Sequence, residues 1–355
     1  MALRHWDGFS AYRASSDLDA LYVREGAAAN LSVVVGGGPS GLGAVRLGEA
    51  GTMWAGFYRT ITSSSEIIVG FWFNYLGWDG GTYGSDSIFK ANYGATDAME
   101  VRLFADGTLK VFYSGYSEIF SSADPAQMID GMPRFLEVGR EYRIELRLNP
   151  SSTVGKVELH VDGVVWCNLT GISINGYSIT RLIFQTGETG EGASFEVSEI
   201  YCFDPTTGIN TDFLTTWKAQ ILRPTSDDGS PGFTNGAATY NYENVDDAPD
   251  HDADGTINYS TANAQIDLFA TTGTLDGGTV RPIAANVVNI ARHEGTAQKL
   301  RNVCKHSATS SNGADVALTA DFLPLIQSFE TCPSTSTAWT KAQIEAAKFG
   351  YESRA

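Results

Sequence analysis

Alternation of apolar and polar residues is the main signal in this chain, and it is clearest between Arg140 and Phe213. In Arg140–Leu148 (REYRIELRL) a two-residue period places the apolar side chains on one face and the charged ones on the other. Lys156–Val165 (KVELHVDGVV) continues the alternation, and its Asp-Gly pair is typical of a tight turn because both residues tolerate positive φ. Strands with one apolar face need a second sheet to bury it, so this stretch predicts one sheet of a β-sandwich.

The same stretch ends with a further predicted pair of strands, Arg181–Thr186 and Ser194–Phe203, which flank a glycine-rich loop. The earlier part of the chain is expected to supply the facing sheet. Its predicted strands are Leu31–Val35, Trp54–Thr60, Glu66–Leu76, Ser87–Asn92, Ala98–Phe104 and Thr108–Tyr113. About a dozen strands in some two hundred residues is the size of a jelly-roll sandwich.

A second, smaller β-rich domain is predicted to follow. Trp217–Pro224 is interpreted as a strand leading into it, and the chain is predicted to close with a helix over Trp339–Phe349. Thr340 and Gln343 have the spacing of a capping box, and Gly350 supplies a C-terminal stop. The other strands predicted in this second domain are Ile266–Ala270, Val280–Arg292, Thr296–Ser307 and Asp315–Glu330. The expected domains are 1–214, a sandwich, and 215–355, a β-rich domain with a terminal helix.

Charge narrows the choice of partners. The chain of 355 residues has a formal net charge of -17, which argues against nucleic acid because phosphate binding needs a basic face. No window has the length and apolarity of a membrane span, and the start MALRHWDGFS has no apolar signal region. We therefore expect neither a membrane partner nor a signal peptide, and synthesis in the cytoplasm.

A glycine-rich stretch, Gly36–Gly41, matches the G-x-G-x-x-G fingerprint and follows the strand Leu31–Val35. A dinucleotide site also needs a helix that points at the pyrophosphate and a second strand that ends in an acidic residue. Thr52–Thr60 ends without one, and no strand–helix–strand alternation follows. The stretch is therefore predicted to be a hairpin turn that binds no FAD or NAD.

One loop resembles a metal site. Asp250, Asp252 and Asp254 alternate before Gly255, as in the first half of an EF-hand loop. Thr261 occupies the position of the bidentate Glu, and no helices are predicted on either side. Either a weak calcium site or a solvated acidic loop fits this pattern, and no other cofactor is expected.

The four cysteines, Cys167, Cys202, Cys304 and Cys332, are too sparse for a disulfide framework and form no Cys-x-x-Cys pair. Buried free thiols are the favoured interpretation. Pairing of Cys167 with Cys202 or of Cys304 with Cys332 stays open.

The sequence contains no clear pattern of catalytic residues. A sandwich glycosidase needs two carboxylates that reach one bond, and the nearest candidates are Glu196 and Glu199. Their odd separation on a strand predicts opposite faces. No Ser lies in a G-x-S-x-G turn. We therefore expect no enzymatic activity.

Aromatic residues offer a binding alternative. Trp72, Tyr75, Trp78 and Tyr83 lie on or beside one predicted strand and the loop after it. Such residues stack on sugar rings, and they also fill cores. The sequence alone leaves both roles open for them.

Several phrases resemble a group of bacteriophage virion proteins with a concanavalin A/laminin-G-like N-terminal domain. The phrases are Arg140–Gly171, Ser198–Leu214 (SEIYCFDPTTGINTDFL), Asn241–Asp247 (NYENVDD) and Trp339–Tyr351 (WTKAQIEAAKFGY). The resemblance implies a concanavalin A-like jelly roll in the first domain and attachment by the second. It also implies a structural protein of the virion, in a tail, fibre or baseplate or as a capsid decoration.

The partners implied are other virion proteins and copies of the chain itself in a symmetric assembly. The alternative function is a carbohydrate-binding module that recognises glycans of the host surface. An enzyme that uses flavin or nicotinamide is the third class. The phrases are too short to transfer any functional residue.

Overall fold

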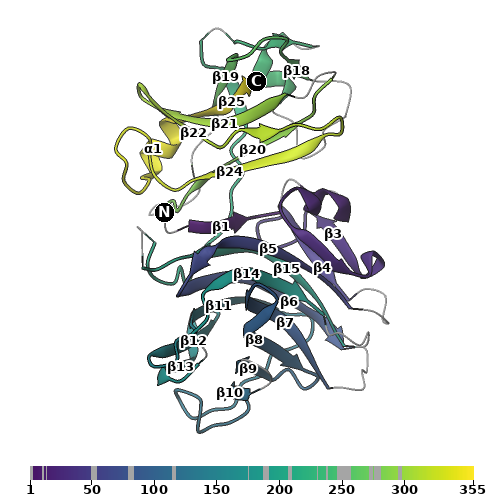
Figure 1. The fold of residues 1–355 in the computed structure, drawn as a ribbon, viewed down its shortest axis with the longest axis vertical. Helices are drawn as coiled ribbons and strands as arrows, with labels where there is room; N and C mark the ends of the chain where they lie inside the picture. The colour runs from purple at the N-terminus through teal and green to yellow at the C-terminus, as the bar shows by residue number, and fades with distance from the viewer. Residues whose placement is uncertain are drawn as a thin grey trace. The chain divides into compact units, whose positions relative to one another are not determined.

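The computed structural model describes residues 3–9, 12, 14–48, 54–78, 84–113, 117–174, 176–186, 192–206, 210–229, 231–236, 239–245, 257–271, 275, 281–294 and 298–355. The chain divides into two compact units, Met1–Ala219 and Gln220–Ala355. Antiparallel strands build both units, which run from purple to teal and from green to yellow in Figure 1. A mainly-β fold, with a sandwich followed by a smaller β-rich unit that holds a short C-terminal helix, is confirmed.

The first unit consists of two antiparallel sheets. In the eight-stranded sheet, here called the first sheet, β1 (Leu3–Asp7) pairs with β15, and the other strands follow in the order β13 (Val164–Ile172), β12 (Gly155–Val161), β11 (Glu141–Asn149), β6 (Ile67–Trp78), β15 (Ala193–Phe203), β4 (Gly43–Leu47) and β3 (Leu31–Val35). The seven-stranded sheet, here called the second sheet, has the order β10 (Ser117–Ser121), β9 (Leu109–Tyr113), β8 (Thr96–Phe104), β7 (Ser85–Tyr93), β14 (Ile179–Gln185), β5 (Ala55–Ser64) and β2 (Val23–Gly26). Short 3₁₀ turns, η1 (Ser15–Ala20) and η2 (Ala28–Asn30), connect the first strands.

The pair of strands predicted at 181–186 and 194–203 does not stay together. β14 lies between β5 and β7 in the second sheet, whereas β15 lies between β6 and β4 in the first. The prediction of a single closing sheet was wrong because each strand presents a complete apolar face, and alternation does not say which sheet that face joins.

Phenylalanine rings join the two sheets. Phe184 of β14 lies at 5.1 Å from Phe71 of the first sheet, with the ring planes nearly perpendicular. Its ring also contacts Phe57 at 5.4 Å and Phe89 at 5.3 Å, both from the second sheet. All four side chains are fully buried, so the alternating apolar faces meet in one aromatic core.

The glycine-rich stretch is a hairpin, as predicted. β3 and β4 pair in antiparallel register from Leu31 with Leu47 to Val35 with Gly43. Between them Gly36, Gly38 and Gly41 have φ of 72°, 73° and 67°. Glycine adopts this left-handed region without steric cost, which explains the density of glycine here.

The second unit has a six-stranded sheet and a facing pair. In the six-stranded sheet β23 (Val316–Ala317) pairs with β21, and the other strands follow in the order β16 (Pro224–Asp227), β19 (Ile266–Thr271), β25 (Lys348–Arg354), β21 (Lys299–His306) and β22 (Thr309–Asn312). The remaining elements are the pair β20 (Ala285–Ala291) and β24 (Leu323–Phe329), the pair β17 (Thr234–Asn235) and β18 (Asn258–Tyr259), and the 3₁₀ turn η3 (Asn241–Asn244). The amide of buried Asn302 on β21 donates to the carbonyls of Val287 and Leu325, which ties the sheet to the facing pair.

The predicted terminal helix is shorter than expected. The capping box is confirmed, because Gln343 N donates to Thr340 Oγ1 at 3.2 Å and Thr340 N donates to Gln343 Oε1 at 2.9 Å. The helix α1 (Lys341–Ala346) then ends, and β25 enters the sheet between β19 and β21. Gly350 is therefore not a helix stop. A Cβ there would lie 1.9 Å from the carbonyl oxygen of Asp267, so glycine allows the strands to approach.

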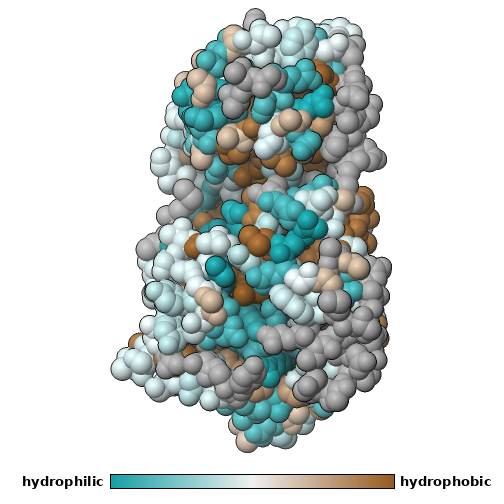
Figure 2. Space-filling model, turned by 45° about the vertical axis from the view of Figure 1, so that its right-hand side comes forward, coloured by the Kyte–Doolittle hydropathy of each residue, from teal (hydrophilic) through white to brown (hydrophobic). Residues whose placement is uncertain are grey.

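Hydrophilic and hydrophobic residues alternate over the face shown in Figure 2, where the brown residues form separate patches. None of the helices in the described ranges has the length and apolarity needed to cross a bilayer.

We predict that deletion of residues 339–355 unfolds the second unit and leaves the first unit intact. The deletion removes β25 from the middle of its sheet and Trp339, which is 2 % exposed in the core. Loss of a buried Trp alone costs about 3–5 kcal/mol, which is comparable to the stability of a small domain. Hydrogen exchange of the chain that lacks residues 339–355 would show full exchange in residues 220–338 only. The control is deletion of exposed Ala355 alone; protection retained in the longer deletion would contradict the prediction.

Candidate functional site

The outer face of the first sheet carries the best candidate for a binding site. Along β6 the side chains of Phe71, Phe73 and Tyr75 point into the core, and each is at most 1 % exposed. Trp72 and Asn74, between them, are half-buried on the opposite face. Alternation therefore leaves an indole ring and an amide on the side of the sheet that faces away from the second sheet.

Cross-strand register places polar side chains on both sides of these two residues. Asn74 pairs with Glu141 of β11 and with Glu196 of β15. Trp72 pairs with Arg143 and with Ser198 on the same two strands. Directly opposite residues lie about 4.5–5.5 Å apart between Cβ atoms, so two rows of side chains cross three adjacent strands.

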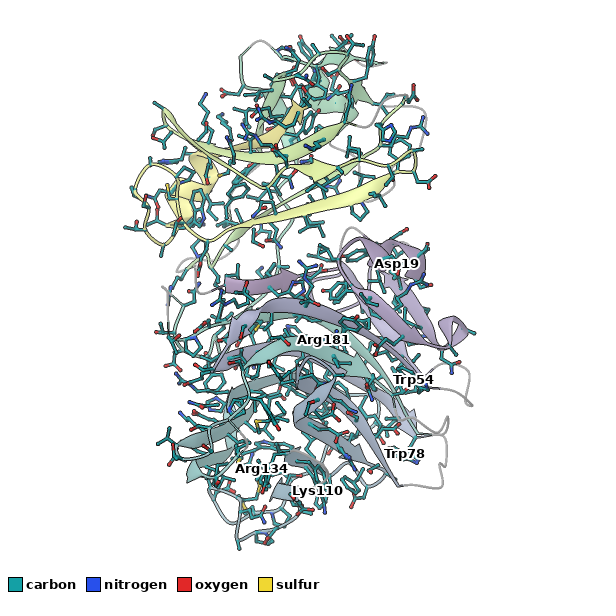
Figure 3. All side chains as sticks on the ribbon, viewed as in Figure 1. Asp19, Trp54, Trp78, Lys110, Arg134 and Arg181 are labelled. Carbon is teal, nitrogen blue, oxygen red and sulfur yellow. The ribbon has the colours of Figure 1, made fainter. Side chains whose placement is uncertain are left out.

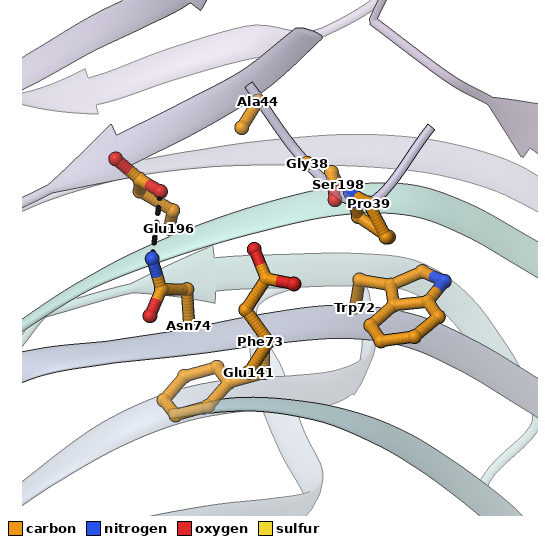
Figure 4. Close-up of a pocket in the computed structure, with 9 residues that line it drawn as sticks. All are labelled: Gly38, Pro39, Ala44, Trp72, Phe73, Asn74, Glu141, Glu196 and Ser198. Atoms are coloured by element: carbon orange, nitrogen blue, oxygen red, sulfur yellow. Dashed lines mark hydrogen bonds between the residues drawn. The ribbon is translucent and has the colours of Figure 1, made fainter. Parts of the chain in front are cut away.

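A shallow hollow lies over these rows, and its enclosed part has room for about one water molecule, with open solvent above it. Its floor comes from the strands and its wall from the glycine-rich hairpin. The lining residues are Gly38, Pro39, Ala44, Trp72, Phe73, Asn74, Glu141, Glu196 and Ser198. Figure 4 shows the Glu141 carboxylate between the Asn74–Glu196 pair and the Trp72 indole.

Close contact holds the hairpin against the sheet. A Cβ at Gly38 would lie 2.6 Å from Ser198 Oγ, which is closer than real Cβ atoms approach their neighbours. Ser40 N donates a hydrogen bond of 3.1 Å to Glu199 Oε1. The stretch that imitates a nucleotide-binding loop therefore forms the wall of a different kind of hollow.

A β-bulge at Glu199 changes the direction of the side chains on β15. The register to β6 shifts between Ser198 and Tyr201, and Glu199 has φ of 48°. Its carboxylate accepts from the backbone of Ser40, on the same outer side as Glu196 and Ser198. The predicted placement of Glu196 and Glu199 on opposite faces is therefore wrong, because a bulge resets the two-residue period. Burial raises the pKa of Glu199, and the hydrogen bonds from Ser40 and Ala219 oppose that rise.

The segment 210–219, here called the strap, covers the neighbouring part of this face. Leu214 N and Thr215 N donate to Glu145 Oε1 at 2.8 and 3.1 Å, and the hydroxyl of Tyr201 donates to the same oxygen. The strap thus donates hydrogen bonds to one oxygen of a carboxylate that is fully buried.

Trp217 extends the strap to the edge of the hollow. Its indole nitrogen donates to the carbonyl of Glu199 at 3.1 Å, and its ring lies 6.1 Å from that of Trp72. The strand predicted over Trp217–Pro224 does not form, because the first of these residues bind to the bulge of β15 and the next strand, β16, begins only at Pro224.

The two carboxylates of the hollow differ in their partners. Glu196 Oε1 accepts from Arg46 at 2.6 and 2.9 Å, and Glu196 Oε2 accepts from the amide of Asn74 at 3.0 Å. Glu141 is exposed, and within the described ranges no ion pair or hydrogen bond engages its carboxylate. Glu196 is therefore a fixed part of the wall, and Glu141 is an acceptor open to a ligand.

The aromatic residues predicted to bind a ligand do not share one surface. Trp72 lines the hollow, whereas Tyr75 is 1 % exposed on the core face of the same strand. Trp78, labelled in Figure 3, is the last residue of β6 and does not line the hollow. Tyr83 lies outside the described residues. Alternation along β6 places Tyr75 on the core face with Phe71 and Phe73, so its side chain is not available to a ligand.

The outer face of the second sheet is also polar, with cations stacked on aromatic rings. Arg181 lies over Tyr58 at 4.7 Å from the ring centroid (Figure 3), and Arg102 over Phe112 at 4.6 Å. Arg102 also pairs with Glu100 at 2.7 Å. These groups largely bind one another, so this face is the weaker candidate.

The predicted calcium ligands Asp250, Asp252 and Asp254 lie outside the described residues. Among the described residues no group of three or more His, Cys, Asp or Glu side chains is placed to hold a metal ion. The four cysteines are buried free thiols, which agrees with the favoured interpretation of the sequence.

Comparisons with known proteins give no family. No family model matches the sequence, and no curated protein matches it. Among solved structures, a sialidase is 16 % identical over 57 % of this chain and 18 % of its own, with a TM-score of 0.40. The cellulose-induced protein Cip1 is 13 % identical over 56 % and 96 %, with a TM-score of 0.42, and the alginate lyase Aly36B is 9 % identical over 56 % and 95 %, with a TM-score of 0.38. The chain thus spans about a fifth of the sialidase, and likeness at this level carries no argument about function.

We predict that Gly38→Ala destabilises the first unit more than Gly36→Ala. Both glycines have nearly the same positive φ, so both variants carry the strain of a left-handed alanine, about 1–2 kcal/mol. Only at position 38 would the new Cβ meet Ser198, whereas position 36 has no atom within 4 Å. Overpacking of this kind adds about 1–3 kcal/mol. Urea unfolding of the two variants measures the difference, and equal losses would show that the hairpin is not held against β15.

Proposed function

We propose that this protein is a non-catalytic structural component of a bacteriophage particle. The support is the resemblance of four stretches of its sequence to virion proteins, together with an exposed apolar loop that has the character of a protein contact. In this proposal the chain occurs in several copies that bind other virion proteins, and it binds neither nucleic acid nor membrane.

The apolar loop, residues 123–139, is the observation that carries the proposal. Ile129, Met132, Phe135 and Val138 are 63 %, 59 %, 46 % and 61 % exposed. Soluble monomers rarely concentrate large apolar side chains at the surface, and such groups are typical of interfaces.

Backbone hydrogen bonds fix this loop in place. Leu136 N donates to Gly107 O at 2.8 Å, and Arg134 N donates to Ser122 O at 2.9 Å. Leu136 itself is 3 % exposed and anchors the loop in the core. The exposed side chains are therefore held in position before any partner binds, which lowers the entropy lost on association.

The stretches that resemble virion proteins coincide with architectural features. Ser198–Leu214 contains the bulge of β15 and the start of the strap. Trp339–Tyr351 contains the capped helix and the beginning of the central strand β25. Asn241–Asp247 begins with η3, whose Asn241 donates to buried Asp267 at 2.7 Å. A resemblance in such positions supports a shared two-unit architecture.

We predict that Phe135→Ser reduces incorporation of the protein into particles of the phage that encodes it. Truncation of an aromatic side chain in an interface commonly costs more than 1 kcal/mol, which corresponds to roughly tenfold weaker binding. Quantitative mass spectrometry of gradient-purified particles measures the copies retained. Val154→Ser, at a position 66 % exposed between β11 and β12, is the matched control. Absence of the unaltered protein from purified particles would refute the virion role, and normal incorporation of Phe135→Ser would refute the role of the loop.

Carbohydrate recognition is the second candidate function, and the hollow on the first sheet favours it. A half-buried indole, a carboxylate open to a ligand, an amide and a hydroxyl converge there within a small volume. Sugars combine apolar ring faces with hydroxyl groups, so stacking and hydrogen bonding at one place suit them. Glu196 is already bound to Arg46 and Asn74, which supports binding without hydrolysis.

We predict that Trp72→Ala strongly weakens glycan binding and that Trp78→Ala does not. Trp72 lines the hollow, and Trp78 is a half-buried tryptophan on the same strand outside it. Loss of the stacking ring is expected to weaken binding by roughly tenfold or more. A glycan array identifies the ligand and calorimetry compares the variants. Asn74→Ala changes the hollow but leaves the contact between Trp72 and Trp217 in place, so it tests the hollow separately from that contact. Binding that survives both changes in the hollow would place recognition elsewhere.

A further inference from the structure

The chemistry of the hollow points to the class of sugar it takes, an inference that rests on the carbohydrate-recognition candidate above. The hollow leaves neutral donors and acceptors for a ligand, together with the Glu141 carboxylate. Asn74 uses one N–H of its amide on Glu196, which leaves its second N–H and its carbonyl oxygen, and the Trp72 indole N–H has no partner among the described residues. The Glu141 carboxylate has no partner within the described ranges. Ser198 adds a hydroxyl group, which donates or accepts.

The cations around the hollow are already engaged. Arg46 donates through Nε and Nη2 to Glu196. The Arg143 guanidinium lies 5.6 Å from the centroid of Trp72 and donates to the carbonyl of Thr215 at 2.7 Å. Its Nε also lies 3.8 Å from Asp162. Both guanidinium groups therefore already have acceptors within the protein.

Negative charge therefore dominates at the mouth. Glu141 is exposed there, and buried Glu199 lies beneath the hairpin that forms the wall. The whole chain adds a net charge of -17, which lowers the local concentration of anions at low salt. A uronic or sialic acid would bring a carboxylate toward Glu141 without a cation to receive it, so the hollow disfavours acidic sugars.

We propose that the hollow selects saccharides that donate hydrogen bonds and carry no negative charge, with protonated amino sugars as the preferred class. The ring face of such a sugar stacks on Trp72, and its hydroxyl groups donate to Asn74 Oδ1 and Ser198 Oγ. The ammonium group lies against Glu141, where a charge-assisted hydrogen bond is stronger than a neutral one.

The test compares three tetrasaccharides by calorimetry with the full chain: glucosamine tetramer, its fully N-acetylated form and a galacturonate tetramer. The first two differ in charge and in the acetyl group at the same positions. The glucosamine tetramer is expected to bind about tenfold tighter than the acetylated form, and this preference is expected to shrink with added salt because the contact is partly exposed. The galacturonate tetramer is expected to bind weakest.

Glu141→Gln is expected to remove the preference for the glucosamine tetramer over the acetylated form, because the amide keeps the size of the side chain and loses its negative charge. Glu118→Gln makes the same change of charge on β10 of the other sheet and is the matched control. Both positions are exposed, so neither change should affect folding.

The outcomes separate the two levels of the proposal. If none of the tetrasaccharides binds and the glycan array is also empty, carbohydrate recognition itself fails. If a neutral or acidic sugar binds through Trp72 at least as well as the glucosamine tetramer, recognition stands and the selection of amino sugars is overturned. A preference for glucosamine that Glu141→Gln leaves unchanged would overturn the role of Glu141.

Discussion

The structure of the first unit depends on the burial of two alternating apolar faces against each other. Phe184 and its three phenylalanine neighbours bring strands of both sheets into one aromatic core. Each such ring removes a large apolar area from water, and together they fix which side of every strand faces inward. The remaining side of each strand must then carry polar groups, and the binding hollow is built on one of these outer faces.

The bulge at Glu199 links the core to the hollow. By interrupting the period of β15 it brings Tyr201 onto the outer face, where its ring packs over Gly70 and its hydroxyl group reaches Glu145. The strap binds this same pair of residues through Leu214 and Thr215. A single irregular residue thus positions the hairpin, the strap and Trp217 around Trp72.

The two proposed roles use different surfaces of the first unit. The apolar loop 123–139 follows β10 of the second sheet, whereas the hollow lies on the outer face of the first. Attachment to a particle and recognition of a sugar therefore require different residues, and a protein of this design would perform both without competition. The net charge of -17 of the chain favours binding of a cationic sugar at Glu141. The same charge keeps a protein that is present in many copies soluble.

The sequence by itself determined the local features. The two-residue period identified most strands, Gly36–Gly41 defined a hairpin, and Thr340 with Gln343 marked the start of the only α-helix among the described residues. These signals are local because they arise from backbone sterics and from hydrogen bonds between residues close in the chain.

The tertiary structure decided how these pieces combine. It placed β14 and β15 in different sheets, turned the residues after Ala346 into the central strand β25, and separated Trp72 from Tyr75. It also brought Glu196 and Glu199 to one side and set Glu141 beside Asn74, which is 67 positions away in the chain. Strand partners and bulges are chosen by contacts between segments distant in the sequence, so the period of one strand does not contain them.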